Sequence, residues 1–251
     1  MIFSELGNLD PLQGLIAAAI VFVGGFIRGF VGFGSALIIV PVLALMFTPQ
    51  LAVIMHGIMD LPSNFQLLPT AVRHCSRRTV VPMALSLAAG IPIGVYFLSS
   101  VDAAPMRIII SILVLVMVGL LALNTRIVFG TGVKTLVSSG IIGGIIHGMS
   151  AVGGPPVVAF LTARKDAPVT TRGNVVVIMS LLVLSGILGY WAFGLITVQS
   201  LVLGGFAAPI YMLATYLGSR YFRTGGSGIY RTMTLLVLAL TSISTLFLSF
   251  W

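Results

Sequence analysis

The stretch at residues 24–40, GGFIRGFVGFGSALIIV, decides the fold that we predict for this chain. It holds five glycines in an otherwise apolar run, and it also contains an arginine, Arg28. We predict a helix that enters a membrane, breaks near its middle at residues 32–34 and returns as a second, short helix. Such a break is tolerated at membrane depth only where the freed backbone groups are buried in protein or line a wet cavity. The stretch therefore indicates a helical hairpin whose tip lies beside a polar space.

Composition places this hairpin in a polytopic helical membrane protein. Of the 251 residues, 58% are hydrophobic and 7% are charged, and apolar runs recur along the whole length. This predicts an all-α protein with several transmembrane helices and no soluble domain. The net charge of +8 does not predict a nucleic-acid partner, because the basic residues stand at the ends of apolar segments, where they orient the spans. No metal or nucleotide motif is visible, so we expect no cofactor and no bound metal.

Two of the apolar segments are too short to cross a membrane. The segments at 35–47 and 155–163 fall short of the roughly 20 residues that a hydrocarbon core of about 30 Å requires. We interpret each as the returning arm of a hairpin formed with the segment before it. The predicted segments are 12–31, 35–47, 50–72, 79–99, 105–124, 135–149, 155–163, 172–194, 197–218 and 229–250.

The distribution of lysine and arginine supports the hairpin interpretation. If each hairpin enters and leaves on one side, the basic loops at 73–78, 126–134, 164–172 and 220–231 share one face, and the other face keeps only Arg107. The positive-inside rule makes the first face cytoplasmic and places both termini outside. If each hairpin were one long span, the basic loop at 164–172 would lie outside, which the rule disfavours.

The chain also contains an internal repeat. An offset of 119 residues places four glycines of the first stretch on glycines of a second stretch, and it places Arg28 on His147. We predict two repeats, residues 1–125 with a hairpin at 12–47 and residues 126–251 with a hairpin at 135–163, each followed by three full spans. Three spans between equivalent points invert the orientation, so the halves are inverted repeats. Inverted repeats with broken helices near the midplane are typical of secondary transporters.

Pairs of small residues four positions apart recur in the hairpins and in the later spans. Such pairs let helix backbones approach closely, and we interpret them as packing surfaces rather than ligand contacts. They are Gly25 with Gly29, Gly90 with Gly94, Gly144 with Gly148, and Ala214 with Gly218.

At the two hairpins the sequence resembles the TauE/SafE family of membrane permeases, the sulfite exporters. The family carries two copies of a glycine-rich motif followed by a short apolar run with a proline, and here the copies read GGFIRGFVGFGSALIIVP and GGIIHGMSAVGGPPVVAFL. The first copy has Phe33 and Ser35 around Gly34, where three glycines are frequent in the family, and the second has Pro155 and Pro156. The resemblance implies a multi-pass protein of a bacterial cytoplasmic (inner) membrane. It also implies sulfite, sulfonates, related sulfur anions or some organic acids as substrates.

The hairpin tips are the predicted substrate site. Each tip opens a half-helix whose first N–H groups have no partner inside the helix, and the helix dipole adds positive charge there. An anion can bind such groups. The alternative is that the tips are only tight packing turns. The tip residues predicted to bind the substrate are Gly32, Phe33, Gly34 and Ser35 in the first hairpin, and Ser150, Gly153 and Gly154 in the second.

Arg28 and His147 occupy equivalent positions just before the two tips. A charge near the bilayer centre is unfavourable by about 2.5–3.5 kcal/mol on insertion scales, so Arg28 is a functional candidate that can hold an oxyanion bidentately. The alternative is that Arg28 pairs with Asp60 and only stabilises the fold. His147 is predicted to donate to the anion or to carry a proton; the alternative is a neutral histidine satisfied by a neighbouring helix.

The third segment carries a polar stripe that we connect to proton coupling. His56, Asp60 and Asn64 are spaced four residues apart, so they share one helix face that should turn towards the protein interior. Asp60 is the only acid deep in an apolar segment. We predict Asp60, with His56 and His147, as the groups for proton coupling; the alternative is that Asp60 only neutralises Arg28.

These features together predict a secondary transporter, and by resemblance an exporter, of a small sulfur-containing anion such as sulfite or an organosulfonate. The anion binds between the two tips, and rocking of one half against the other alternates access. A passive anion channel and a carrier of a small organic acid are the alternatives. We disfavour an intramembrane hydrolase built on Ser150 and a histidine, because no water-facing acid completes a triad. The predicted partners are the anion and the lipid bilayer, and a homodimer is left open.

Overall fold

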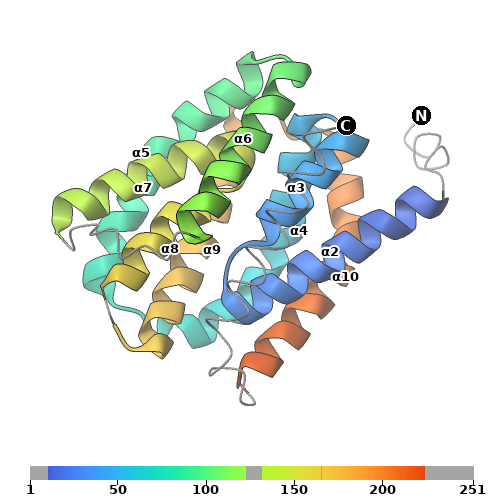
Figure 1. The fold of residues 1–251 in the computed structure, drawn as a ribbon. Coiled ribbons are helices and arrows are strands. Elements are labelled where there is room, and N and C mark those ends of the chain that lie inside the picture. The colour runs from blue at the N-terminus through green and yellow to red at the C-terminus, as the bar shows by residue number, and fades with distance from the viewer. Residues whose placement is uncertain (1–10, 123–131, 165, 224–251) are drawn as a thin grey trace.

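A computed structural model of the chain describes residues 11–122, 132–164 and 166–223, which form nine helices and no strand. The all-α prediction is confirmed, and Figure 1 shows the helices gathered in one bundle. The predicted segment at 229–250 and the predicted boundary between the halves lie outside the described residues. The helices are α2 (Pro11–Val31), α3 (Ser35–Met46), α4 (Pro49–Val72), α5 (Arg77–Ser100), α6 (Ala103–Ala122), α7 (Val133–Ser150), α8 (Gly154–Ala163), α9 (Pro168–Ala192) and α10 (Val198–Arg223).

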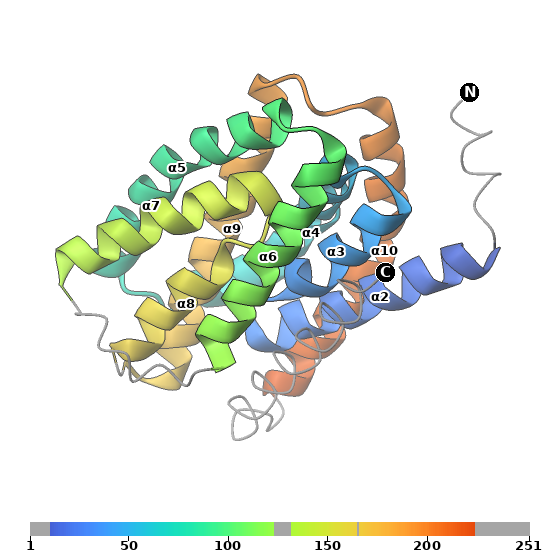
Figure 2. The same cartoon turned by 45° about the horizontal axis from the view of Figure 1, so that its top comes forward.

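Both predicted breaks are present between consecutive helices. The returning arms α3 and α8 have 12 and 10 residues, so they reach only about 18 Å and 15 Å at 1.5 Å per residue. Gly32 and Gly34 have φ angles of 93° and 98°, and Ala151 has a φ of 58°. A residue in this left-handed region ends a helix, because the chain can no longer continue the helical hydrogen bonds. Figure 2 shows α6 lying against both returning arms, and α6 contacts α3 as well as α8.

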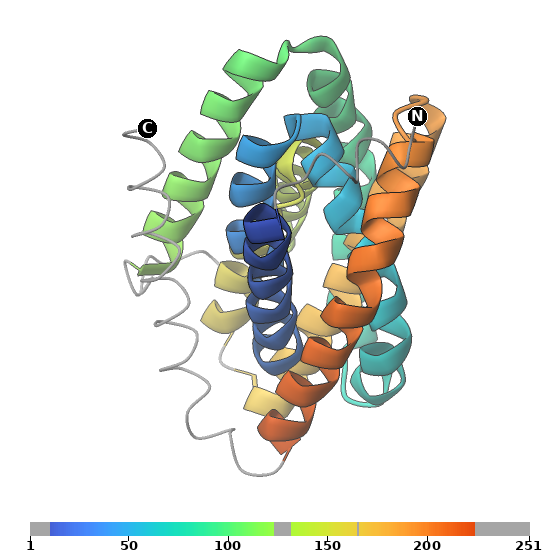
Figure 3. The same ribbon diagram turned by 90° about the vertical axis from the view of Figure 1, so that its right-hand side faces the viewer.

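The small-residue pairs pack helices together, as predicted. A Cβ added to Gly29 would overlap the carbonyl oxygen of Thr215, and one added to Gly218 would overlap that of Phe26, so α2 and α10 touch backbone to backbone. Figure 3 shows these two helices side by side. Gly94 meets the carbonyl of Ile145 in the same way, which brings α5 against α7. Each hairpin's first arm therefore packs on a long helix of the other predicted half.

Two sets of contacts define the ends of the bundle. At one end the guanidinium of Arg172 in α9 donates to the carbonyl of Gly29 at the end of α2, and the backbone N–H of Ser76 donates to Asn174. At the other end Arg107 donates to the carbonyl of Ala44. The basic turn between α4 and α5 thus lies at the same end as the start of α9, whereas Arg107 lies at the opposite end.

Among the helices that the structure describes, four are long and apolar enough to cross a membrane, namely α2, α5, α9 and α10. The helix α4 has 24 residues, so it is long enough, but it carries the polar stripe predicted from the sequence. His56, Asp60 and Asn64 are all buried, which confirms that this face turns inward. These residues lie near the middle of α4, so the polar groups sit deep in the bundle.

Candidate functional site

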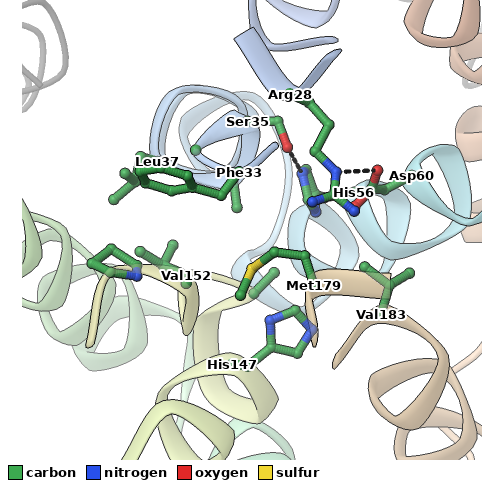
Figure 4. A pocket seen from close by; sticks show the side chains of 15 residues that line it. Arg28, Phe33, Ser35, Leu37, His56, Asp60, His147, Val152, Met179 and Val183 are labelled. Atoms are coloured by element: carbon green, nitrogen blue, oxygen red, sulfur yellow. Dashed lines mark hydrogen bonds and ion pairs between the residues drawn. The ribbon is translucent and has the colours of Figure 1, made fainter. Parts of the chain in front are cut away.

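A small pocket lies between the two hairpin tips. It encloses about 30 Å³ of free volume, enough for one or two water molecules. Figure 4 shows that residues of the first half form one wall and residues of the second half form the wall opposite. The first wall consists of Arg28, Phe33, Gly34, Ser35, Ala36, Leu37, His56 and Asp60, and the second of His147, Ala151, Val152, Gly154, Pro155, Met179 and Val183.

Arg28 is the cation of this pocket, and all three of its nitrogens already have partners. Its Nε lies 3.2 Å from Oδ1 of Asp60, and its Nη2 donates to Oδ1 of Asn64 at 2.9 Å. Its Nη1 donates to the carbonyl oxygen of Gly32, which ties the guanidinium to the hairpin break. The Arg28 and Asp60 side chains are 2% and 3% exposed. The predicted pairing of these two residues is thus present, and the pair is on the pocket wall.

Asp60 is held by more than its arginine. Oδ1 of Asp60 lies 2.7 Å from the hydroxyl of Ser63 and 3.0 Å from the hydroxyl of Tyr211 in α10. The Tyr211 hydroxyl also lies 2.8 Å from Oγ of Ser35, at the start of α3. Because charge-assisted hydrogen bonds favour the ionised form of a carboxyl group, these donors and Arg28 together suit a carboxylate.

A second chain of contacts begins at the same serine. Oγ of Ser35 lies 2.9 Å from Nε2 of His56, and the other ring nitrogen of His56 is buried without a hydrogen-bond partner in the described part of the chain. Ser35, Tyr211 and His56 therefore connect the first hairpin tip to α4 and α10 through polar groups. The edge-to-face contact between the rings of His56 and Tyr211 adds to this link.

The polar network also reaches α9. Oδ1 of Asn64 accepts hydrogen bonds from Arg28 and, at 2.8 Å, from the hydroxyl of Ser180. Ser180 is buried near the middle of α9, so this oxygen joins α2, α4 and α9 at one point.

The two walls of the pocket are related by the offset of the sequence repeat but differ in polarity. The offset of 119 residues pairs Arg28 with His147, Asp60 with Met179, and Ser35 with Gly154, and all six line the pocket. The second-half wall thus has an apolar side chain or none at two of the positions where the first-half wall has a polar one. The cation, the acid and the hydroxyl group of Ser35 all lie on the first wall (Figure 4).

The two half-helices also differ in the backbone donors that they offer. The first N–H groups of a helix lack an internal partner. In α3 the first two of these groups belong to Ser35 and Ala36, whereas the N–H of Leu37 already donates to the carbonyl of Gly34 at 3.2 Å. In α8 the first turn contains Pro155 and Pro156, which carry no N–H, so only Gly154 and the residues before it can donate there.

Most of the residues predicted for the site lie on the pocket wall. These are Arg28, Phe33, Gly34, Ser35, His56, Asp60, His147 and Gly154. Three do not: Gly32 contributes its carbonyl to Arg28, the hydroxyl of Ser150 donates to the carbonyl of Ile146, and Gly153 packs on Gly143 and His147. Substrate contacts by any of the predicted residues, on the wall or off it, stay a prediction. Among the described residues, no group of three side chains could hold a metal ion.

Besides Ser63 and Ser180, the polar site residue that the sequence analysis did not identify is Tyr211. It is fully buried and touches both Ser35 and Asp60, although it is the only polar group in its part of α10 that reaches this pocket network. The available signal was a tyrosine in the middle of an apolar segment, away from the segment ends where tyrosine is common in membrane helices.

Comparison with known proteins shows the family of this chain. The chain is 24% identical over 220 residues to a protein of Cupriavidus necator called "Probable sulfite/organosulfonate exporter TauE", and the match covers 85% of each chain. No solved structure matches the chain. The sequence profile of the family described as "Sulfite exporter TauE/SafE" matches residues 16–245, which is most of the chain. The protein is therefore a multi-pass membrane protein that belongs to the TauE/SafE family.

Proposed function

We propose that this protein is a secondary transporter that exports sulfite or an organosulfonate, with the anion bound in the pocket between the hairpin tips. The observation that carries the proposal is Arg28, a buried cation on the wall of a pocket that both tips enclose. Family membership and the name of the Cupriavidus relative support the substrate class. The proposal includes two inverted repeats, a bacterial inner membrane, and both termini outside.

Several groups in the pocket can donate hydrogen bonds to an oxyanion. The guanidinium of Arg28 has five N–H donors, of which its protein partners use three, so two remain for the anion. The N-terminal N–H groups of α3 and the hydroxyl of Ser35 add neutral donors. On the opposite wall, the apolar side chains of Met179 and Val183 would face the substituent of a sulfonate. The pocket must widen to admit a substrate, which fits a carrier that changes its conformation.

Flux into liposomes that contain the purified protein tests the proposal. We expect saturable uptake of sulfite and of methanesulfonate by the parent protein, and at least a tenfold loss in Arg28→Ala. Ser35→Ala keeps the pair of Arg28 with Asp60 and should weaken substrate affinity with a smaller effect on stability. Uptake by Arg28→Ala at the parent rate, with unchanged affinity, would remove this residue from the mechanism.

Arg164→Ala is the matched control for the loss of an arginine. Arg164 also pairs with an aspartate, at 3.4 Å from Asp166, but both side chains are 29% exposed and lie outside the pocket. This variant removes the same charge and the same kind of ion pair, so its uptake should equal that of the parent. Thermal unfolding in detergent shows whether each variant is folded before its uptake is compared.

The same liposomes separate the proposal from its alternatives. A carrier preloaded with unlabelled methanesulfonate accelerates entry of labelled methanesulfonate, whereas a passive channel gives linear flux without this counterflow. Competition with acetate tests the carrier of a small organic acid, because such a carrier would bind acetate at least as tightly as a sulfonate. Thiol reagents applied from one side locate Cys75, which the proposed topology puts in the cytoplasm.

A further inference from the structure

The ionisable groups that line the pocket carry no net formal charge. Arg28 and Asp60 are the charged pair, and the other ionisable side chains on the wall are His56 and His147. With neutral histidines the site is therefore balanced before any substrate arrives. A monovalent anion that binds at Arg28 adds a second negative charge within a few ångströms of the Asp60 carboxylate, in a buried place.

Two like charges that share one small buried site do not both stay ionised, and a proton is taken up instead. We propose that Asp60 takes this proton, so that the protein carries one proton with each monovalent anion. This inference rests on the proposed function and adds the coupling ion. Asp60 is the resident counter-ion of Arg28, and the substrate replaces it in that role.

The groups around Asp60 favour it over the histidines as the proton acceptor. From α2 it faces Arg28, from α10 it faces Tyr211, and on its own helix it faces His56; from α3 the hydroxyl of Ser35 is one contact further away. Of the acidic and histidine side chains on the pocket wall, Asp60 is the one that contacts the guanidinium that the anion must use. Its neutralisation therefore relieves the direct repulsion, whereas a proton on His147, across the pocket, leaves the carboxylate in place.

The site carries no net charge in either the empty or the loaded state of the transport cycle. The empty site holds Arg28 as a cation and Asp60 as an anion. The loaded site holds the Arg28 cation, the sulfonate anion and a neutral Asp60, whose proton comes from the side on which the sulfonate entered. The proton leaves with the sulfonate on the other side and no bond is broken. The site is therefore electrically neutral, both empty and loaded, when the protein switches from one side of the membrane to the other. An unbalanced charge inside the bundle at that step would be strongly unfavourable.

Methanesulfonate is the suitable probe, because it stays a monovalent anion across the working pH range and any pH dependence then reports the protein. In liposomes, an acidic exterior should drive methanesulfonate uptake above its equilibrium level, and an entrapped pH dye should record one proton per anion. A potassium diffusion potential should leave the uptake rate unchanged. Methanesulfonate affinity should fall about tenfold per pH unit above the titration of the coupling group, as linkage to one proton requires.

Asp60→Asn supplies the permanently neutral form of the same side chain. We expect its methanesulfonate affinity to vary less than twofold over that pH range, and any flux that it retains to carry no protons and to respond to the potential. His56→Gln and His147→Gln should still carry one proton with each methanesulfonate that they transport. Asp102→Asn is the control, since Asp102 is an exposed acid at the start of α6 and its loss should leave uptake and pH dependence unchanged.

The outcomes separate the inference from the proposed function. Saturable uptake by the parent protein that follows the potential and ignores pH overturns the coupling but keeps the transporter. If Asp60→Asn keeps the pH dependence of uptake and His147→Gln loses it, then His147 is the proton acceptor and the assignment to Asp60 is overturned. Absence of uptake of any sulfur anion at every pH refutes the proposed function itself. The measurements on the parent protein decide the coupling even if Asp60→Asn does not fold.

Discussion

At the scale of single residues, Arg28 shows how a cation is kept deep in an apolar bundle. An isolated charge there is strongly unfavourable, and Arg28 is compensated by one ion pair and two further acceptors, on Asn64 and Gly32. The acceptors come from α4 and from the hairpin break, so the fold must be complete before the arginine is satisfied. A residue held for packing alone has no need of this arrangement, since a buried hydrophobic pair of the same size is often equally stable.

The pair should therefore show strong energetic coupling. Arg28→Met leaves the Asp60 carboxylate buried without its partner, and Asp60→Leu does the converse, so we expect each to destabilise the protein by about 3–5 kcal/mol. The double variant leaves neither charge behind, and Tyr211 and Ser63 each keep another acceptor, on Ser35 and on the Asp60 main chain. It should be more stable than either single variant, as measured by thermal unfolding in detergent. Additive losses in the double variant would contradict this coupling.

At the scale of elements, the glycine faces decide which helices touch. In α10, a Cβ on Gly218 would overlap the carbonyl of Phe26 in α2, whereas a Cβ on Gly205 would meet nothing within 4 Å. Both glycines lie in one helix, so the same substitution at the two positions separates packing from helix propensity.

Gly218→Ala should destabilise the protein by about 1–3 kcal/mol, because the backbones of α2 and α10 must move apart. Gly205→Ala should stabilise it by about 0.5–1 kcal/mol, because alanine restricts the unfolded chain and nothing opposes the methyl group. The melting temperatures in detergent measure both effects. Shifts of the same sign and size at both positions would show that the contact between α2 and α10 is not the cause.

The elements also show why most of the fold, but not all of the site, is predictable from the sequence. Breaks and helix starts have local signals, such as Gly32 and Gly34 at the first tip and Pro49 and Pro168 at the first positions of α4 and α9. The polar stripe of α4 is local as well. The link from Tyr211 to Asp60 joins positions 151 residues apart, and no local pattern marks such a contact.

At the scale of the whole molecule, the halves of the sequence do not correspond to separate bodies. The first arm α2 touches α10 backbone to backbone, and α7 touches α5 in the same way, so each close contact joins the first half to the second. A rocking motion of intact halves would have to pull these backbones apart. We therefore expect the moving bodies to be each hairpin together with the long helix on which it packs, with the pocket between them.

The two tips belong to different bodies in this arrangement and should separate during transport. A Cβ built on Gly154 lies 3.8 Å from Cβ of Phe33, which is the usual separation across a disulfide. In a Cys75→Ser background, which removes the only native thiol, Phe33→Cys with Gly154→Cys should form a bond on oxidation. We expect oxidation to abolish sulfonate counterflow and a reductant to restore it to the level of the same protein before oxidation. The two single-cysteine variants should not respond to oxidant. If fully cross-linked protein kept the counterflow rate of the same protein before oxidation, the tips would have to stay together throughout the cycle. Alternating access would then require another pair of moving elements.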